Sequence, residues 1–120
     1  AWIIGAYGAT KAALDRYTVA LAHEVQEHDI FVNCMMPTSI VLTSGADYVR
    51  DIARKNPDWV EPVEMMAEGA LELCSGRHVG RVIASRDIVH YAGRKVHSLD
   101  GREVIGDAFL LADPESTAGA

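Results

Sequence analysis

Residues 7–14 read YGATKAAL and open the longest periodic segment of the chain. Apolar side chains then recur at Leu14, Leu21 and Val25, the spacing of an amphipathic helix. The segment is also rich in alanine, which favours a helix and lets a second helix approach closely. We therefore expect a long helix over residues 7–28 with a face suited to a helix–helix contact.

A short apolar strand is expected directly after this helix. Residues 30–36 are almost continuously apolar and end at Pro37, the pattern of a strand buried on both faces of a parallel sheet. A helix entrance follows at residues 61–64, where a proline and acidic residues suit the first turn of a helix reaching about Cys74. Residues 80–85 form a second apolar run. The order helix, strand, helix, strand predicts an α/β fold built on βαβ units.

Shorter features fill the remaining segments. Residues 38–60 are expected to form a loop that carries a short helix near residues 46–55. A helical turn is expected over residues 87–92, and Asp100-Gly101 is a turn signal. The polar tail from about residue 113 to residue 120 is expected to be frayed.

Composition limits the class of protein. The chain has 120 residues, 49% of them hydrophobic, and its 11 basic and 17 acidic residues give a formal charge of −6. An acidic chain without a basic stripe is not expected to bind nucleic acid. Without a run of roughly 18 apolar residues no membrane span is expected, so a cytoplasmic protein is the default. Cys34 and Cys74 have no metal-ligand spacing, so we expect buried cysteines and no metal site.

Tyr7 and Lys11 are the pair of residues best suited to acid–base chemistry. They are four positions apart, so their side chains lie on one face of a helix. A phenol has an ordinary pKa near 10, and a neighbouring ammonium stabilises the phenolate. The pair can therefore serve acid–base chemistry, although the same spacing also occurs on ordinary exposed helix faces.

The helix 7–28, the strand that ends at Pro37 and the strand 80–85 together resemble the short-chain dehydrogenase/reductase family. The resemblance covers residues 1 to about 90 in the right order. It implies that residues 1–120 are the C-terminal part of an NAD(P)-binding domain. Such a part would hold about two strands and the long helices of a Rossmann-like, doubly wound parallel sheet.

The resemblance implies hydride transfer between NAD or NADP and a small alcohol or ketone. Tyr7 would be the general acid and base, and Lys11 would lower the pKa of Tyr7 and hold the nicotinamide ribose. It also implies an oligomer assembled through helix 7–28.

A loop after the first strand would lie along the nicotinamide. The cofactor-binding residues that the resemblance implies there are Pro37, Thr38, Ile40 and Thr43. Thr38 stands where the family usually has glycine, and Thr43 lies one residue late in the pattern. Residues 44–60, with Trp59 near their end, form either a substrate lid or an ordinary surface connection.

The N-terminal half of the family pattern has no counterpart in the sequence. The chain begins without Met at AWIIGA, an apolar stretch typical of a strand exit, and contains neither a glycine-rich phosphate turn nor an upstream catalytic serine. We therefore expect a fragment that is inactive in isolation. Two alternatives stay open: a non-catalytic oligomerisation module, and the same fold with epimerase or dehydratase chemistry.

Overall fold

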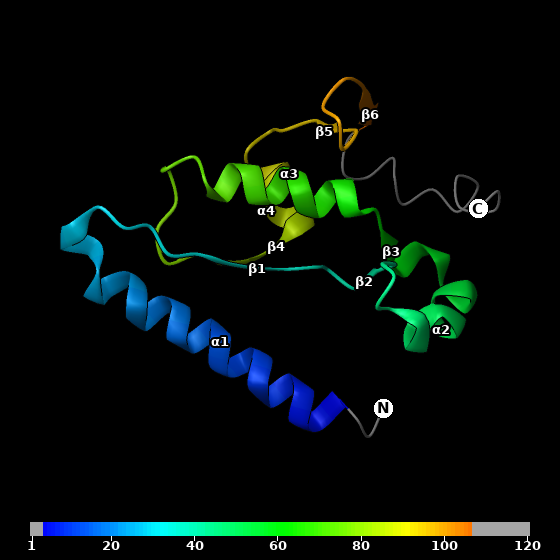
Figure 1. The fold of residues 1–120 in the computed structure, drawn as a ribbon, viewed down its shortest axis with the longest axis horizontal. Coiled ribbons are helices and arrows are strands. Elements are labelled where there is room, and N and C mark those ends of the chain that lie inside the picture. The colour runs from blue at the N-terminus through cyan, green and yellow to red at the C-terminus, as the bar shows by residue number, and fades with distance from the viewer. Residues whose placement is uncertain (1–3, 107–120) are drawn as a thin grey trace.

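The computed structural model describes residues 4–106, in which helices alternate with short strands (Figure 1). Helix α1 spans Ile4–Glu24, and a 3₁₀ turn, η1, follows at Gln26–His28. The long predicted helix is confirmed, but it begins at Ile4, so residues 4–6 of the predicted strand exit are helical, and residues 1–3 lie outside the described residues. The predicted frayed tail lies outside the described residues.

Two parallel strands form the centre of the fold. Strand β1, Cys34–Met36, pairs with β4, Val82–Ala84, with Cys34 opposite Val82 and Met36 opposite Ala84. Helix α3, Val63–Leu73, lies between them in the sequence. The parallel pairing confirms the predicted βαβ arrangement and an α/β fold.

Strand β1 is shorter than the predicted run over residues 30–36. The side-chain Oδ1 of Asn33 accepts the backbone N–H of Arg81 at 3.0 Å, and therefore takes a donor that could otherwise extend the ladder. Phe31 is half exposed and β1 is half-buried, whereas the pattern predicted burial on both faces. Within residues 4–106, β1 has β4 as its one neighbouring strand, which explains the partial burial.

A second parallel pair follows the first strand. Strand β2, Ile40–Val41, pairs with β3, Val60–Glu61, with Ile40 opposite Val60. The connection between them contains α2, Arg50–Lys55, flanked by the 3₁₀ turns η2, Asp47–Val49, and η3, Pro57–Trp59. The short predicted helix is confirmed, but the β2–β3 pair was not expected from the sequence.

Helices α3 and α4 pack closely against each other. Helix α4 spans Ser85–Tyr91 and confirms the predicted helical turn. Gly69 on α3 permits the contact, because a Cβ there would lie 2.6 Å from Met35 Sδ and 3.1 Å from Ile88 Cγ2. Met65 on α3 and Val89 on α4 are fully buried next to Val96.

An antiparallel hairpin covers the other side of α3. Its strands are β5, Val96–His97, and β6, Val104–Gly106. The predicted turn at Asp100-Gly101 joins them, and Gly101 has φ 72°, a conformation that glycine adopts without strain. The hairpin itself was not predicted.

Buried carboxylates on α3 hold this hairpin in place. Glu68 accepts hydrogen bonds from Arg94 Nη2 at 2.6 Å and contacts His97 Nδ1 at 3.1 Å. Glu72 pairs with Arg94 at 3.1 Å and with His78 Nε2 at 2.8 Å. Because an unpaired buried carboxylate is costly, these contacts make the hairpin and α3 interdependent.

Helix α1 is largely uncovered by the described residues. It buries Thr18 and Ala22, whereas Leu14 and Tyr17 are at least half exposed. The Cys34 thiol donates to Asp15 Oδ1 at 3.5 Å and ties the middle of α1 to β1.

The two cysteines differ from the expected burial. Cys34 is half-buried and Cys74 is exposed. Cys74 follows the last residue of α3, at a helix end that faces solvent, so the prediction of a buried residue is wrong there.

Candidate active site

Tyr7 and Lys11 lie together on the first turns of α1. Lys11 Nζ is 5.3 Å from the centroid of the Tyr7 ring, within the range of a cation–π contact. Thr10 Oγ1 donates to the carbonyl oxygen of Tyr7 at 2.7 Å, so the intervening hydroxyl is bonded to the helix itself. The predicted proximity of the tyrosine and the lysine is thus present in the structure.

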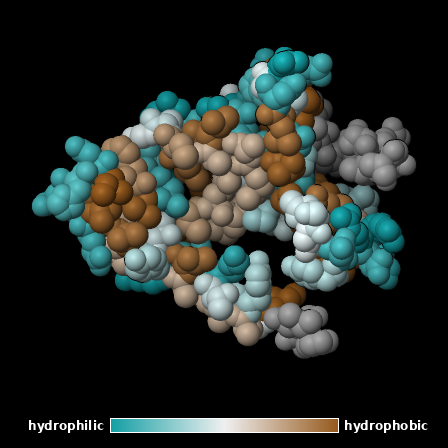
Figure 2. Space-filling view, viewed as in Figure 1, coloured by the Kyte–Doolittle hydropathy of each residue, from teal (hydrophilic) through white to brown (hydrophobic). Residues whose placement is uncertain are grey.

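Among residues 4–106, little covers the amino-terminal end of α1. The Tyr7 side chain is 56% exposed. A Cβ added at Gly5 or Gly8 would meet no atom within 4 Å. Figure 2 shows a hollow between this part of α1 and the segments drawn above it. A small molecule therefore has room to approach the phenol and the ammonium.

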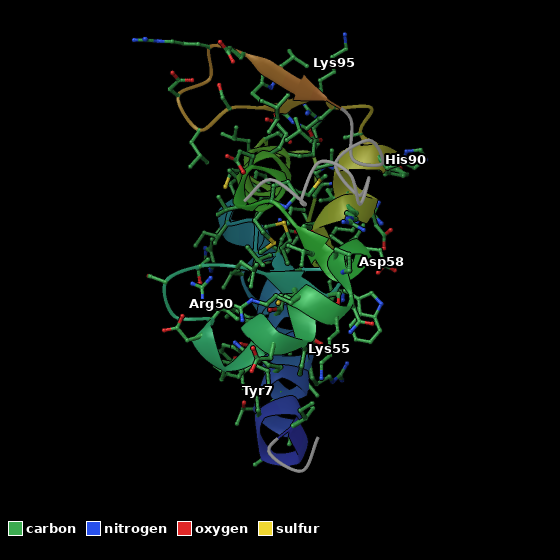
Figure 3. The ribbon with its side chains drawn as sticks, turned by 90° about the vertical axis from the view of Figure 1, so that its right-hand side faces the viewer. Tyr7, Arg50, Lys55, Asp58, His90 and Lys95 are labelled. Atoms are coloured by element: carbon green, nitrogen blue, oxygen red, sulfur yellow. The ribbon has the colours of Figure 1, made fainter. Side chains whose placement is uncertain are left out.

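The loop over residues 37–43 lies at the same end of the molecule as Tyr7. Figure 1 shows the chain leaving β1 towards β2 on the side where α1 begins, and Figure 3, viewed from that side, shows Tyr7 beneath the segment that carries Arg50 and Lys55. In open parallel sheets, ligands bind outside the carboxyl ends of the strands. The carboxyl end of β1 and the start of α1 thus lie on the same side of the structure (Figure 1).

The loop residues themselves have separate partners. Pro37 and Ile40 are half-buried, and Thr38 and Thr43 are exposed. The backbone N–H of Thr38 donates to Glu61 Oε2 at 3.2 Å. The carbonyl of Thr43 accepts from the backbone N–H of Ala46 at 3.0 Å and from Arg50 Nη2 at 3.3 Å. Within residues 4–106, the loop forms no hydrogen bond with Tyr7 or Lys11.

A buried carboxylate beneath this loop was missed by sequence reasoning. Glu61 is 1% exposed, and its carboxylate accepts the hydroxyl of Ser85 as well as the N–H of Thr38. Arg86 Nε lies 3.4 Å from the same oxygen that Thr38 contacts. The sequence indicated only an acidic residue at the entrance of α3, and no local pattern points to Thr38 or Ser85 as its partners.

The exposed polar groups fit part of a nicotinamide cofactor. The Tyr7 hydroxyl and the Lys11 ammonium can hydrogen-bond ribose hydroxyls, because one can donate or accept and the other offers three donors. Thr38 and Thr43 are exposed residues, and the Thr38 N–H is already bonded to Glu61.

Residues 4–106 contain neither a metal-binding cluster nor a membrane-spanning helix. In this part of the chain, no group of three or more His, Cys, Asp or Glu side chains is arranged to hold a metal ion. None of its helices combines the length and the apolar character needed to cross a membrane.

Residues 2–53 match the short chain dehydrogenase family. The matched span contains Tyr7, Lys11 and the whole loop 37–43, so the resemblance stated from the sequence is confirmed over this part of the chain. No curated protein and no solved structure matches the chain.

Proposed function

Since residues 2–53 match the short chain dehydrogenase family, we propose that this chain is part of an oxidoreductase acting on a small alcohol or ketone with NAD or NADP. The observation that carries the proposal is the Tyr7–Lys11 pair, in which the ammonium lies 5.3 Å from the phenol ring at an open helix end. The pair combines a proton donor with a neighbouring cation, and both suit the protonation step of carbonyl reduction.

Tyr7 is the general acid and base of the proposed reaction. In the reductive direction its hydroxyl donates a proton to the carbonyl oxygen, and in the oxidative direction the phenolate accepts the proton of the alcohol. Lys11 stabilises the negative charge on the phenol oxygen through its ammonium and offers its remaining donors to the ribose hydroxyls. A bound nicotinamide cofactor would supply or accept the hydride.

The loop residues orient the reacting groups. Pro37, Thr38, Ile40 and Thr43 lie at the carboxyl end of β1, where they would border the nicotinamide side of the site. Residues 44–60 continue from this loop through α2, and Trp59 is exposed near their end. A substrate lid in this segment remains part of the proposal.

We also propose that further strands complete the domain. Helix α1 leaves Tyr7, Leu14 and Tyr17 at least half exposed, and β1 has an uncovered edge within residues 4–106. Large apolar side chains and open strand edges are normally covered in a stable domain. A glycine-rich phosphate turn and a catalytic serine would lie in the completing part.

A Tyr7→Phe variant of the complete protein tests the acid–base role. The variant and the wild type are assayed with NAD and NADP against a panel of small alcohols and ketones, following the absorbance of the reduced nicotinamide. Removal of the hydroxyl should lower kcat by about 100- to 10,000-fold, the usual contribution of a general acid. Circular dichroism should remain unchanged, because the ring stays in place.

Tyr17→Phe is the matched control. Tyr17 lies on the same helix, is equally exposed, and has no lysine four residues after it. Its activity should equal that of the wild type. An unchanged kcat in Tyr7→Phe would refute the proposed role of Tyr7, and turnover of substrate without any nicotinamide would favour epimerase or dehydratase chemistry.

A further inference from the structure

Glu61 is a fully buried carboxylate whose partners come from different segments of the chain. It accepts the backbone N–H of Thr38 from the loop 37–43 and the hydroxyl of Ser85 from the start of α4. Arg86 supplies the compensating positive charge, with Nε 3.4 Å from Oε2. A buried carboxylate is tolerated when its oxygens are bonded in this way, so its position is tightly determined.

The consequence of these contacts is a loop attached to β3 at two places. Glu61 holds the backbone at Thr38 through its side chain, and the β2–β3 pairing places Ile40 opposite Val60 and Val41 opposite Glu61. Thr38, Ile40 and Val41 are therefore all held against one strand. A loop held in this way has little freedom to move its backbone groups.

The same contacts explain how threonine can occupy position 38. Among the non-glycine residues in the described part, Asp29 is the one with positive φ, so the backbone of Thr38 has an ordinary conformation. Glycine is not required there, and the Thr38 N–H is directed to a carboxylate. The ordinary backbone conformation therefore accommodates threonine at the position where the family usually has glycine.

The structure assigns Glu61 the role of a positioning residue for the nicotinamide end of the cofactor site. The inference rests on the proposed function. Glu61 acts through Thr38: it fixes the loop at the carboxyl end of β1, and this loop borders the place where the nicotinamide ring must lie beside Tyr7. The adenosine end of the cofactor does not depend on this contact.

Comparing the binding of two ligands shows whether Glu61 positions the nicotinamide end of the site or only stabilises the fold. The complete protein is titrated with its preferred nicotinamide cofactor and with ADP-ribose, or its 2′-phosphate for an NADP enzyme, which lacks the nicotinamide. Glu61→Gln removes the charge that accepts the Thr38 N–H. The Kd of the cofactor should rise about tenfold, the change expected for one hydrogen bond to a charged group. The Kd of ADP-ribose should stay within twofold of the wild type.

Glu72→Gln is the matched control. Glu72 is a buried carboxylate with arginine partners, but its contacts are with His78, Arg77 and Arg94 and not with the loop 37–43. This variant should lower the melting temperature and leave both dissociation constants unchanged. A merely structural role for Glu61 would give the same result as Glu72→Gln, and that outcome would overturn the inference.

Ser85→Ala provides a second variant if Glu61→Gln does not fold. It removes the hydroxyl that holds the other carboxylate oxygen and leaves the charge in place. The cofactor Kd should rise about threefold, less than for loss of the charge, with ADP-ribose binding unchanged. Equal changes for both ligands, or no change for either, would overturn the inference. Failure of the wild type to bind any nicotinamide cofactor would instead refute the proposed function.

Discussion

At the scale of single residues, Lys11 is the cation proposed to support the acid–base chemistry of Tyr7. Its ammonium lies beside the phenol ring and its side chain is exposed. Lys11→Met removes this charge, so kcat should fall about 100-fold, the usual cost of losing one electrostatic donor in an active site. Lys95→Met, an exposed lysine directly before β5, is the control. Equal activity in the two variants would contradict the assignment.

Glu72 is expected to make the free energy of unfolding depend on pH. Hydrogen bonds from His78 and Arg77, and a further one from Arg94, lower the pKa of Glu72 from 4.5 to about 2 despite its burial. A carboxyl whose pKa is lowered by folding stabilises the protein above its unfolded pKa. That stabilisation is lost as the pH falls through the folded value.

The free energy of unfolding should therefore decrease as the pH is lowered from about 4.5 to about 2. Urea titrations at several pH values measure the effect. Glu72→Gln cannot ionise at this position, so its stability should change less over the same interval. Parallel pH profiles for the wild type and the variant would show that Glu72 does not cause the dependence.

At the scale of the secondary-structure elements, the contact of α3 with β1 and α4 depends on Gly69. A methyl group there would collide with Met35 and crowd Ile88. Gly69→Ala should therefore destabilise the protein by about 1–3 kcal/mol, even though alanine favours a helix.

Gly8→Ala is the control for this substitution. Its Cβ would meet no atom within 4 Å, so the intrinsic preference of alanine should stabilise α1 by about 0.5–1 kcal/mol. Thermal or urea denaturation measures both variants. A stabilising effect of Gly69→Ala would mean that α3 does not pack this closely.

The sequence predicted the elements whose pattern is local. Helix α1 begins with an alanine-rich periodic segment. Neighbouring prolines mark the end of β1, at Pro37, and the start of α3, after Pro62. The pairs β2–β3 and β5–β6 involve strands of two or three residues, which are too short to show a period. Glu61 was missed because its partners, Thr38 and Ser85, are distant in the sequence and adjacent only in the fold.

At the scale of the whole molecule, the uncovered face of α1 governs the behaviour of the isolated chain. Tyr7, Leu14, Tyr17 and the following Phe31 are half exposed or more. If further strands normally cover this face, the chain of 120 residues should aggregate and show no turnover with nicotinamide cofactors.

Sedimentation velocity and the activity assay on this chain distinguish a fragment of a larger domain from an oligomerisation module. A folded oligomer of defined size without activity would favour an oligomerisation module that assembles through α1. Robust turnover by the isolated chain would show that the described residues contain a sufficient active site.

The pairing of β1 with β4 also determines when this part of the molecule can form during synthesis. Cys34–Met36 leave the ribosome before their partners Val82–Ala84, and α3 must be made between them. Until then α1 and β1 are a nascent segment with an open edge. Contacts between residues this far apart form slowly, so β1 exposes an unpaired, aggregation-prone edge until β4 has been made.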